Sequence, residues 1–66
     1  MRVTLNGETR ELRDGLTVDE LVRELGLRPP RIAVEINLDV LARDEFAARA
    51  LCDGDVVEIV HFIGGG

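Results

Sequence analysis

The spacing of apolar positions changes several times along this chain. At the start, Val3 and Leu5 alternate with polar residues, which is the period of a half-buried strand. Asn6-Gly7 follows, the strongest short hairpin signal, so residues 8–12 are expected to return as an antiparallel strand. The N-terminal residues therefore predict a β-hairpin.

The register of this hairpin leaves two alternatives. A strict two-residue turn would place Glu8 and Arg10 on the same face as the apolar Leu5 and Val3. Either the loop is longer than two residues, or that end of the hairpin extends beyond the hydrophobic core. Both alternatives satisfy the pattern of the sequence.

Residues 16–27 have the period of a helix instead. Thr17 and Glu20 form a capping box, and the apolar positions after them follow the i, i+3, i+4, i+7 spacing. Gly26 suits the left-handed residue that ends a helix, and Pro29-Pro30 prevents continuation. We predict one short helix with a single apolar stripe. The stripe comprises Val18, Leu21, Val22 and Leu25.

Two more strand-like segments follow this helix. Residues 32–36 alternate between apolar branched side chains and smaller or polar ones, which predicts a third strand. The segment Asn37-Leu38-Asp39 is typical of a turn, and residues 40–42 are expected to form a short fourth strand. These two strands would then lie side by side as a second hairpin.

The last third of the chain returns to the sheet. Residues 44–50 favour a helical turn or an irregular segment, with Phe46 and Leu51 as its anchors in the core. Asp53-Gly54 predicts the last turn, and residues 56–63 the last strand, which is the most apolar of all. The chain then ends in three glycines.

The order β-β-α-β-β-β, with one short helix, indicates a mixed sheet of about five strands packed on that helix. The first and last strands are expected to pair at the sheet centre, because central strands are the most deeply buried. The fold class is therefore α+β, a roll of the β-grasp or ubiquitin-like type. We expect this domain to span residues 1–63, followed by a flexible tail at 64–66.

Composition narrows the possible functions. A chain of 66 residues forms one domain, without room for both a core and an enclosed catalytic pocket. The formal net charge is −5 and every basic side chain is arginine, which disfavours nucleic acid and favours basic protein partners. The single cysteine excludes an internal disulfide, and no apolar run reaches signal or membrane length. We expect a soluble, cytoplasmic protein.

Three segments carry a family resemblance. They are the Asn6-Gly7 hairpin, the helix start Leu16-Thr17-Val18 and, above all, residues 51–66, which read LCDGDVVEIVHFIGGG. Over essentially its whole length the chain resembles the bacterial sulfur carrier proteins of thiamine biosynthesis, which are ubiquitin-like. Two terminal glycines alone are shared by ubiquitin and the small subunit of molybdopterin synthase, so the longer ending is the more specific match.

The resemblance implies a carrier rather than an enzyme. In such families an E1-like adenylyltransferase uses ATP and Mg²⁺ to adenylate the C-terminal glycine. A persulfide from the cysteine desulfurase system then gives a terminal thiocarboxylate, and thiazole synthase takes the sulfur. Carried over to this chain, the adenylated residue that becomes 1-thioglycine is Gly66, and Gly64 and Gly65 thread into the enzymes. No permanently bound cofactor is implied.

Glycine suits this chemistry physically. It has no Cβ, so the carbonyl carbon of Gly66 is uncrowded and the chain can pass through a narrow slot with φ of either sign. Three extended residues reach about 10 Å beyond the last strand. The alternative is a frayed terminus of no function. It is disfavoured because the glycines follow a strand directly, with no polar linker.

The last strand also offers a docking surface. If Val57 and Ile59 face the helix, the opposite face leaves Val60 and Phe62 exposed beside Glu58. Such an apolar patch next to a reactive tail suits docking to the activating enzyme. The alternative is that Phe62 folds over the end of the sheet as part of a minor core.

Other reactive side chains have simpler interpretations. His61 has no second histidine or cysteine at ligand spacing, so we expect no metal site. Cys52 lies beside a turn without a base or cation to activate it, which favours a structural thiol over a nucleophile. Asp53, Asp55 and Glu58 are expected to form a turn and a solvated face rather than an acid–base or Mg²⁺ cluster.

Three classes of function therefore remain. The first is sulfur transfer for thiazole formation, with molybdopterin or tRNA thiolation as alternatives that would use Gly66 in the same way. The second is a ubiquitin-like modifier or interaction module that ends in an amide bond to a target protein. The third, an independent enzyme, is disfavoured because the sequence has no nucleophile–base pair, metal cluster or phosphate loop.

Overall fold

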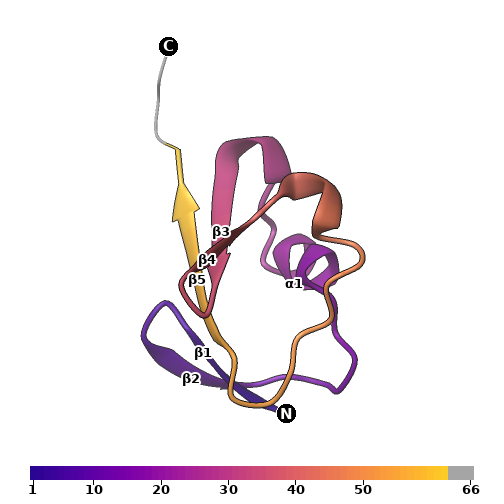
Figure 1. The fold of residues 1–66 in the computed structure, drawn as a ribbon, viewed down its shortest axis with the longest axis vertical. Coiled ribbons are helices and arrows are strands. Elements are labelled where there is room, and N and C mark those ends of the chain that lie inside the picture. Colours follow the sequence, from indigo (N-terminus) through magenta and orange to yellow (C-terminus); the bar gives the residue numbers. More distant parts are fainter. Residues whose placement is uncertain (63–66) are drawn as a thin grey trace.

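Residues 1–62 fold as one sheet with one α-helix against it (Figure 1). The computed structural model describes residues 1–62, so Ile63 and the predicted tail at 64–66 lie outside the described residues. The order of the elements is the predicted one, with two short 3₁₀ helices (η) added. They are β1 (Arg2–Leu5), β2 (Glu8–Glu11), α1 (Val18–Glu24), η1 (Pro29–Arg31), β3 (Ile32–Ile36), β4 (Asp39–Leu41), η2 (Arg43–Glu45) and β5 (Val56–His61).

The strands form a mixed sheet in the order β2-β1-β5-β3-β4. β1 and β5 are parallel, and the other neighbouring pairs are antiparallel. β5, the last strand, therefore lies at the centre beside the first, as its apolar composition predicted. One α-helix against a mixed five-stranded sheet confirms the predicted α+β fold of the β-grasp type.

The hydrophobic core lies between the sheet and α1. Val18 and Val22 of the helix meet Val34 and Val57 of the sheet, and all four side chains are fully shielded from solvent. The long connection from β4 to β5 is anchored by two buried side chains, as predicted. These anchors are Phe46 and Leu51.

The helix begins and ends where its sequence predicts. Thr17 Oγ1 accepts a hydrogen bond from Glu20 N at 3.1 Å, and the Glu20 carboxylate accepts one from Thr17 N at 2.9 Å. Gly26 follows with φ of 75°, a conformation that glycine adopts without strain. α1 has seven residues, and within residues 1–62 no helix has the length and apolarity needed to cross a membrane.

The first hairpin has the shorter of the two predicted loops. Asn6 and Gly7 have φ of 48° and 83°, as a two-residue type I′ turn requires. Leu5 is therefore paired with Glu8, and all of β2 is exposed. The hairpin extends beyond the core, and the alternative of a longer loop is wrong.

Several strand boundaries differ from the prediction by a residue or two; β2 ends at Glu11 and β4 at Leu41, one residue early in each case. The turn between β3 and β4 consists of Asn37 and Leu38 alone, with φ of 52° and 74°, so β4 begins one residue early, at Asp39. A type I′ turn without glycine has no strong sequence signature, which explains the error. β5 ends at His61, and the predicted end at Ile63 lies outside the described residues.

Asp55 fixes the point where β5 begins. Its side chain is 6% exposed, so its predicted place on a solvated face is wrong. The carboxylate accepts hydrogen bonds from Cys52 N at 2.8 Å and Asn37 Nδ2 at 3.0 Å, and lies 3.3 Å from the Arg49 guanidinium. The short loop from Leu51 to Asp55 is thus closed by one buried charge.

The environment of Asp55 makes the stability of the fold depend on pH. Burial alone would raise the pKa of this carboxyl, but the hydrogen bonds from Cys52 and Asn37 and the charge of Arg49 outweigh burial and lower it. A pKa lowered in the folded state means that the ionised form stabilises the fold. This stabilisation is complete above the unfolded pKa and is lost as the pH falls through the folded one.

We predict that Asp55→Asn lowers the free energy of unfolding by about 1–3 kcal/mol at neutral pH. The asparagine NH₂ would replace a carboxylate oxygen that accepts hydrogen bonds, and it would then face other donor groups. Urea unfolding followed by circular dichroism measures the loss. This loss should shrink as the pH falls below about 4, the ordinary pKa of an aspartate in the unfolded chain, because the stabilisation by the ionised carboxylate then progressively disappears. Asp39→Asn, at an exposed side chain, is the control and should change little. A loss of equal size at acidic and neutral pH would contradict the assignment.

Candidate functional site

β5 is the last element before the glycines, and its two faces differ. The face toward α1 carries Val57, Ile59 and His61. The outer face carries Val56, Glu58 and Val60. Val57 is fully buried and Ile59 packs at the edge of the core, whereas the three outer residues are exposed. The predicted division of β5 into a core face and an outer face is confirmed.

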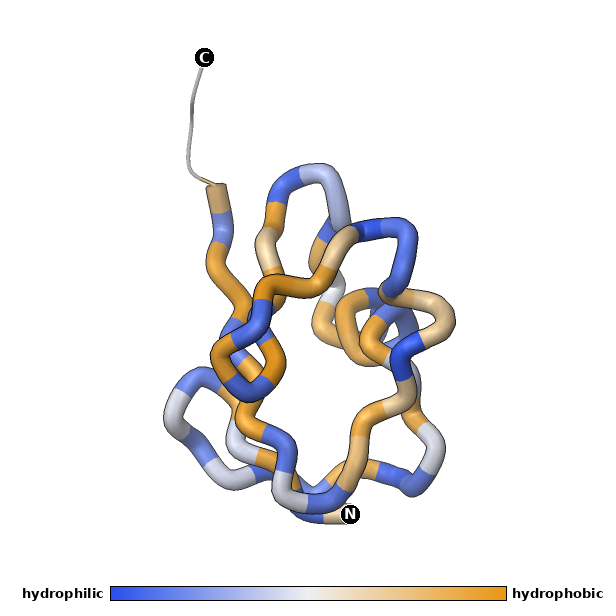
Figure 2. The backbone as a smooth tube through the Cα atoms, viewed as in Figure 1, coloured by the Kyte–Doolittle hydropathy of each residue, from blue (hydrophilic) through white to orange (hydrophobic). Residues whose placement is uncertain are grey.

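The outer face carries an exposed apolar patch near the end of β5. Val60 is 51% exposed and Phe62 is 59% exposed, so the alternative that Phe62 covers the end of the sheet is wrong. Figure 2 shows hydrophobic residues along much of β5 up to the last described residues. The pairing of β5 with β3, and of β3 with β4, adds Val40 to the same face. We call Val40, Val56, Val60 and Phe62 the outer patch.

The polar part of this face is acidic. Glu58 is paired directly with Glu35 of β3, and Glu35 in turn with Val40. Like charges opposite each other weaken a sheet, so this pair does not stabilise the free protein. Together with the net charge of −5, it suits a partner surface that is apolar and basic. The sequence indicated Glu58 as a docking residue but not Glu35 or Val40. These two residues lie near Glu58 only because of the register between β3, β4 and β5.

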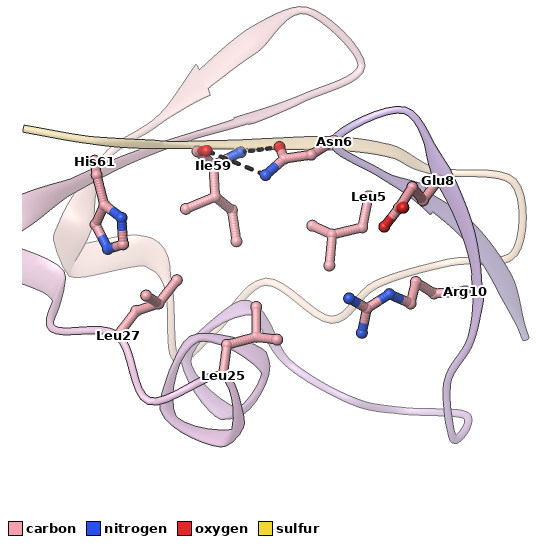
Figure 3. A pocket seen from close by; sticks show the side chains of 8 residues that line it. All are labelled: Leu5, Asn6, Glu8, Arg10, Leu25, Leu27, Ile59 and His61. Carbon is pink, nitrogen blue, oxygen red and sulfur yellow. Dashed lines mark hydrogen bonds between the residues drawn. The ribbon is translucent and has the colours of Figure 1, made fainter.

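An asparagine clamp holds β5 on the side of β1 (Figure 3). Asn6 N donates to Val57 O at 2.9 Å. Its side chain then accepts a hydrogen bond from Ile59 N at 2.8 Å and donates one to Ile59 O at 3.3 Å. The side-chain amide of Asn6 thus makes the hydrogen bonds to Ile59 that a backbone peptide group of β1 would make if β1 continued. At this point the chain has already turned into the hairpin.

A second asparagine does the same on the side of β3. Asn37 N donates to Val56 O at 2.8 Å, and Asn37 Oδ1 accepts from Val56 N at 2.9 Å. Like Asn6, it stands first in a type I′ turn with positive φ, a conformation that asparagine tolerates. The sequence indicated both residues as turn formers only. Their bonds to β5 depend on contacts between segments far apart in the chain.

The remaining predicted residues do not form a reactive cluster. Cys52 is an exposed free thiol, and Asp53 Oδ1 accepts a hydrogen bond from Arg2 N at 2.7 Å. His61 is exposed at the end of β5. Within residues 1–62, no group of three or more histidine, cysteine or acidic side chains could hold a metal ion.

The three glycines lie outside the described residues. The predicted reactive residue Gly66 and the predicted threading residues Gly64 and Gly65 follow Phe62 by a few positions in the sequence. Their roles stay predictions, as does docking through Val60, Phe62 and Glu58. What the structure contributes is the central strand that leads to them, with Val60 and Phe62 of the outer patch near its end.

Comparison with known proteins gives matches over the whole chain. The family model described as the ThiS family matches residues 3–66. The sulfur carrier protein ThiS of Thermus thermophilus is 42% identical over 64 residues, which cover 97% of this chain and 98% of that one. The crystal structure of the thiamine biosynthesis protein ThiS from Geobacter metallireducens has a TM-score of 0.85, with 38% identity and complete coverage of both chains.

A longer protein also matches. The thiazole synthase of Paramagnetospirillum magneticum is 44% identical over 66 residues. These residues are the whole of this chain but only 20% of the length of that protein. A segment similar to this chain therefore occurs within a relative that is named for an enzyme.

We predict that Asn6→Gly lowers the free energy of unfolding by about 1–2 kcal/mol, because glycine keeps the positive φ but loses the two bonds to Ile59. Native-state hydrogen exchange should show the Ile59 amide exchanging faster. Leu38→Gly is the matched control, since Leu38 also has positive φ but is 85% exposed, and it should be neutral or slightly stabilising. Unchanged stability and exchange in Asn6→Gly would refute the clamp.

Proposed function

Because the chain belongs to the ThiS family, we propose that it is a sulfur carrier for thiazole formation in thiamine biosynthesis. The observation that carries this proposal is the family match over residues 3–66, which includes the three glycines as well as the folded body. The reactive group is then the C-terminal carboxylate of Gly66. The rest of the chain presents this group to enzymes.

The proposed chemistry at Gly66 has three steps. A carboxylate carbon is a poor electrophile, so the carboxylate oxygen first attacks the α-phosphate of ATP, with Mg²⁺, and releases pyrophosphate. A persulfide sulfur then attacks the carbonyl carbon of the acyl adenylate and expels AMP. A second thiolate then attacks the sulfur of the donor cysteine in the resulting acyl disulfide, so that the S–S bond breaks, a new disulfide forms on that cysteine and the thiocarboxylate leaves. The E1-like adenylyltransferase supplies this machinery, and the cysteine desulfurase system supplies the sulfur.

The described residues support this role through recognition rather than catalysis. The outer patch and Glu58 lie on the outer face of the sheet, with Val60 and Phe62 at the end of β5 that leads to the tail, and exposed apolar patches on small proteins mark interaction surfaces. The acidic pair Glu35–Glu58 suits basic side chains on the activating enzyme. Docking at this surface would hold the glycines at the mouth of an active site.

Thiazole synthase is the proposed acceptor of the sulfur. A stretch similar to this whole chain occurs within a relative named thiazole synthase, which supports a functional link between the two activities. The rival pathways, molybdopterin synthesis and tRNA thiolation, would use the same thiocarboxylate. An assay of thiazole phosphate formation with purified thiazole synthase separates them.

We predict that incubation with the E1-like enzyme of the same organism, ATP, Mg²⁺ and a persulfide donor replaces one oxygen of Gly66 by sulfur. Intact mass spectrometry with fragmentation detects and locates this exchange. One alanine appended after Gly66 should abolish it, because the activated carboxylate would no longer belong to glycine. Cys52→Ser is the control and should be converted normally. Sulfur found on Cys52, or covalent adducts with target proteins, would contradict the carrier role.

We predict that Phe62→Ala raises the KM of adenylation about tenfold, because a buried aromatic contact with the enzyme is lost. Its free energy of unfolding should change by less than about 0.5 kcal/mol, since Phe62 is exposed in the free protein. Leu38→Ala removes an apolar side chain that is exposed at the opposite end of β3, away from the tail, and should leave the KM unchanged. Loss of melting temperature with an unchanged KM in Phe62→Ala is the result that excludes this surface.

A further inference from the structure

The inner face of the sheet holds a pocket of about 290 Å³ beside the end of β5 (Figure 3). Its apolar residues are Leu5, Leu25, Leu27 and Ile59. Its polar and charged residues are Asn6, Glu8, Arg10 and His61. The pocket exists because β2 places charged side chains over the inner face, and because α1 ends after seven residues. Leu25, Leu27 and Ile59 are consequently only partly buried.

The backbone of β5 also has an open edge at this pocket. Residues of β5 bond alternately to the two neighbouring strands. On the side of β3, Phe62 N donates to Arg31 O at 2.8 Å. On the side of β1, the strand pairing ends at Val57 and the Asn6 side chain bonds Ile59. The backbone of His61 is therefore directed to the side of β1, where within residues 1–62 no strand continues.

From these two features we propose that an extended segment of the activating enzyme pairs with β5 at His61 and inserts an apolar side chain into the pocket. Main-chain hydrogen bonds and a pocket for alternate side chains are the two components of strand addition to a sheet. The partner is the enzyme that takes Gly66, so this inference rests on the proposed function.

The size and the charges of the pocket select this occupant. Its volume lies at or below the lower limit of roughly 300–1,000 Å³ for small-molecule sites, which favours a single side chain. Glu8 and Arg10 both line the pocket, and within residues 1–62 neither forms an ion pair. Charged groups of the partner beside the inserted side chain can therefore pair with Glu8 or with Arg10.

The position of the pocket fits an enzyme that receives the tail. His61 lies on the inner face next to the open edge, and Phe62, the next residue, belongs to the outer patch. A partner that contacts both would hold the end of β5 from its two faces, just before the glycines. Docking through the outer patch alone would leave the strand free to pivot.

Native-state hydrogen exchange of the full chain tests the backbone part directly. We expect the His61 amide to exchange fast in the free protein, and about tenfold or more slower when saturated with the E1-like enzyme. The Val60 amide, which faces β3, should be protected in both states and is the internal control. Unchanged exchange at His61 in a complex that adenylates Gly66 overturns the inference and leaves the proposed function intact. Absence of both complex and adenylation overturns both.

Filling the pocket tests the side-chain part. Glu8→Phe would cover the apolar floor, so we expect the Kd for the enzyme to rise about tenfold while the melting temperature is kept or raised. Glu11→Phe is the matched control, because it removes the same charge and adds the same ring to the other face of β2, at the end of that strand away from the pocket, and its Kd should change less than about twofold. Equal Kd values for the two variants would contradict insertion into the pocket.

A proline substitution at His61 separates the contribution of the backbone N–H from that of the imidazole ring. His61→Pro removes an N–H that the described fold does not use, whereas His61→Ala keeps this N–H and removes only the imidazole. We expect the Kd for the enzyme to rise more with proline than with alanine. An equal or smaller rise in Kd with proline would show that His61 binds the enzyme through its side chain and not through its backbone N–H.

Discussion

The fold depends on one constraint, the pairing of β5 on both of its edges. A terminal strand normally frays, yet β5 lies at the centre of the sheet between β1 and β3. Where these strands end, Asn6 and Asn37 continue the hydrogen bonding with their side chains. Asp55 fixes the start of β5 through a buried carboxylate. The first part of the strand that leads to the glycines is thereby hydrogen-bonded on both of its edges.

Because β5 is held by its edges and its inner face, its outer face is free for recognition. Val57 supplies core packing, while the outer patch and the acidic pair on β3 and β5 contribute little to the free fold. In the proposed carrier, the chemistry belongs to the partner enzymes, so a domain of this size needs no catalytic pocket of its own. The overhanging hairpin adds a second contact region on the inner face.

Local sequence signals predicted much of this architecture. The capping box at Thr17, the alternation in β3 and the apolar last strand predicted the elements and their order. The parity of β5 left two alternatives for Phe62, and the structure decides for the exposed one. The asparagine clamps and the burial of Asp55 were missed, because each depends on a partner from another strand or loop. The register of the first hairpin was undecided for the same reason. Glu8 and Arg10 can lie on the inner face only because α1 does not cover that part of the sheet, and the sequence does not show where the helix ends relative to β2.

The central claim is that Gly66 is the group that carries sulfur. The most direct test is the intact mass of the chain purified from its own cells during active thiamine synthesis, with fragmentation that resolves the last residue. We expect a thiocarboxylate on Gly66 in a fraction of the molecules, which disappears when the E1-like enzyme is deleted. A chain that continues past Gly66, or one that carries only an amide bond to another protein there, would contradict the claim.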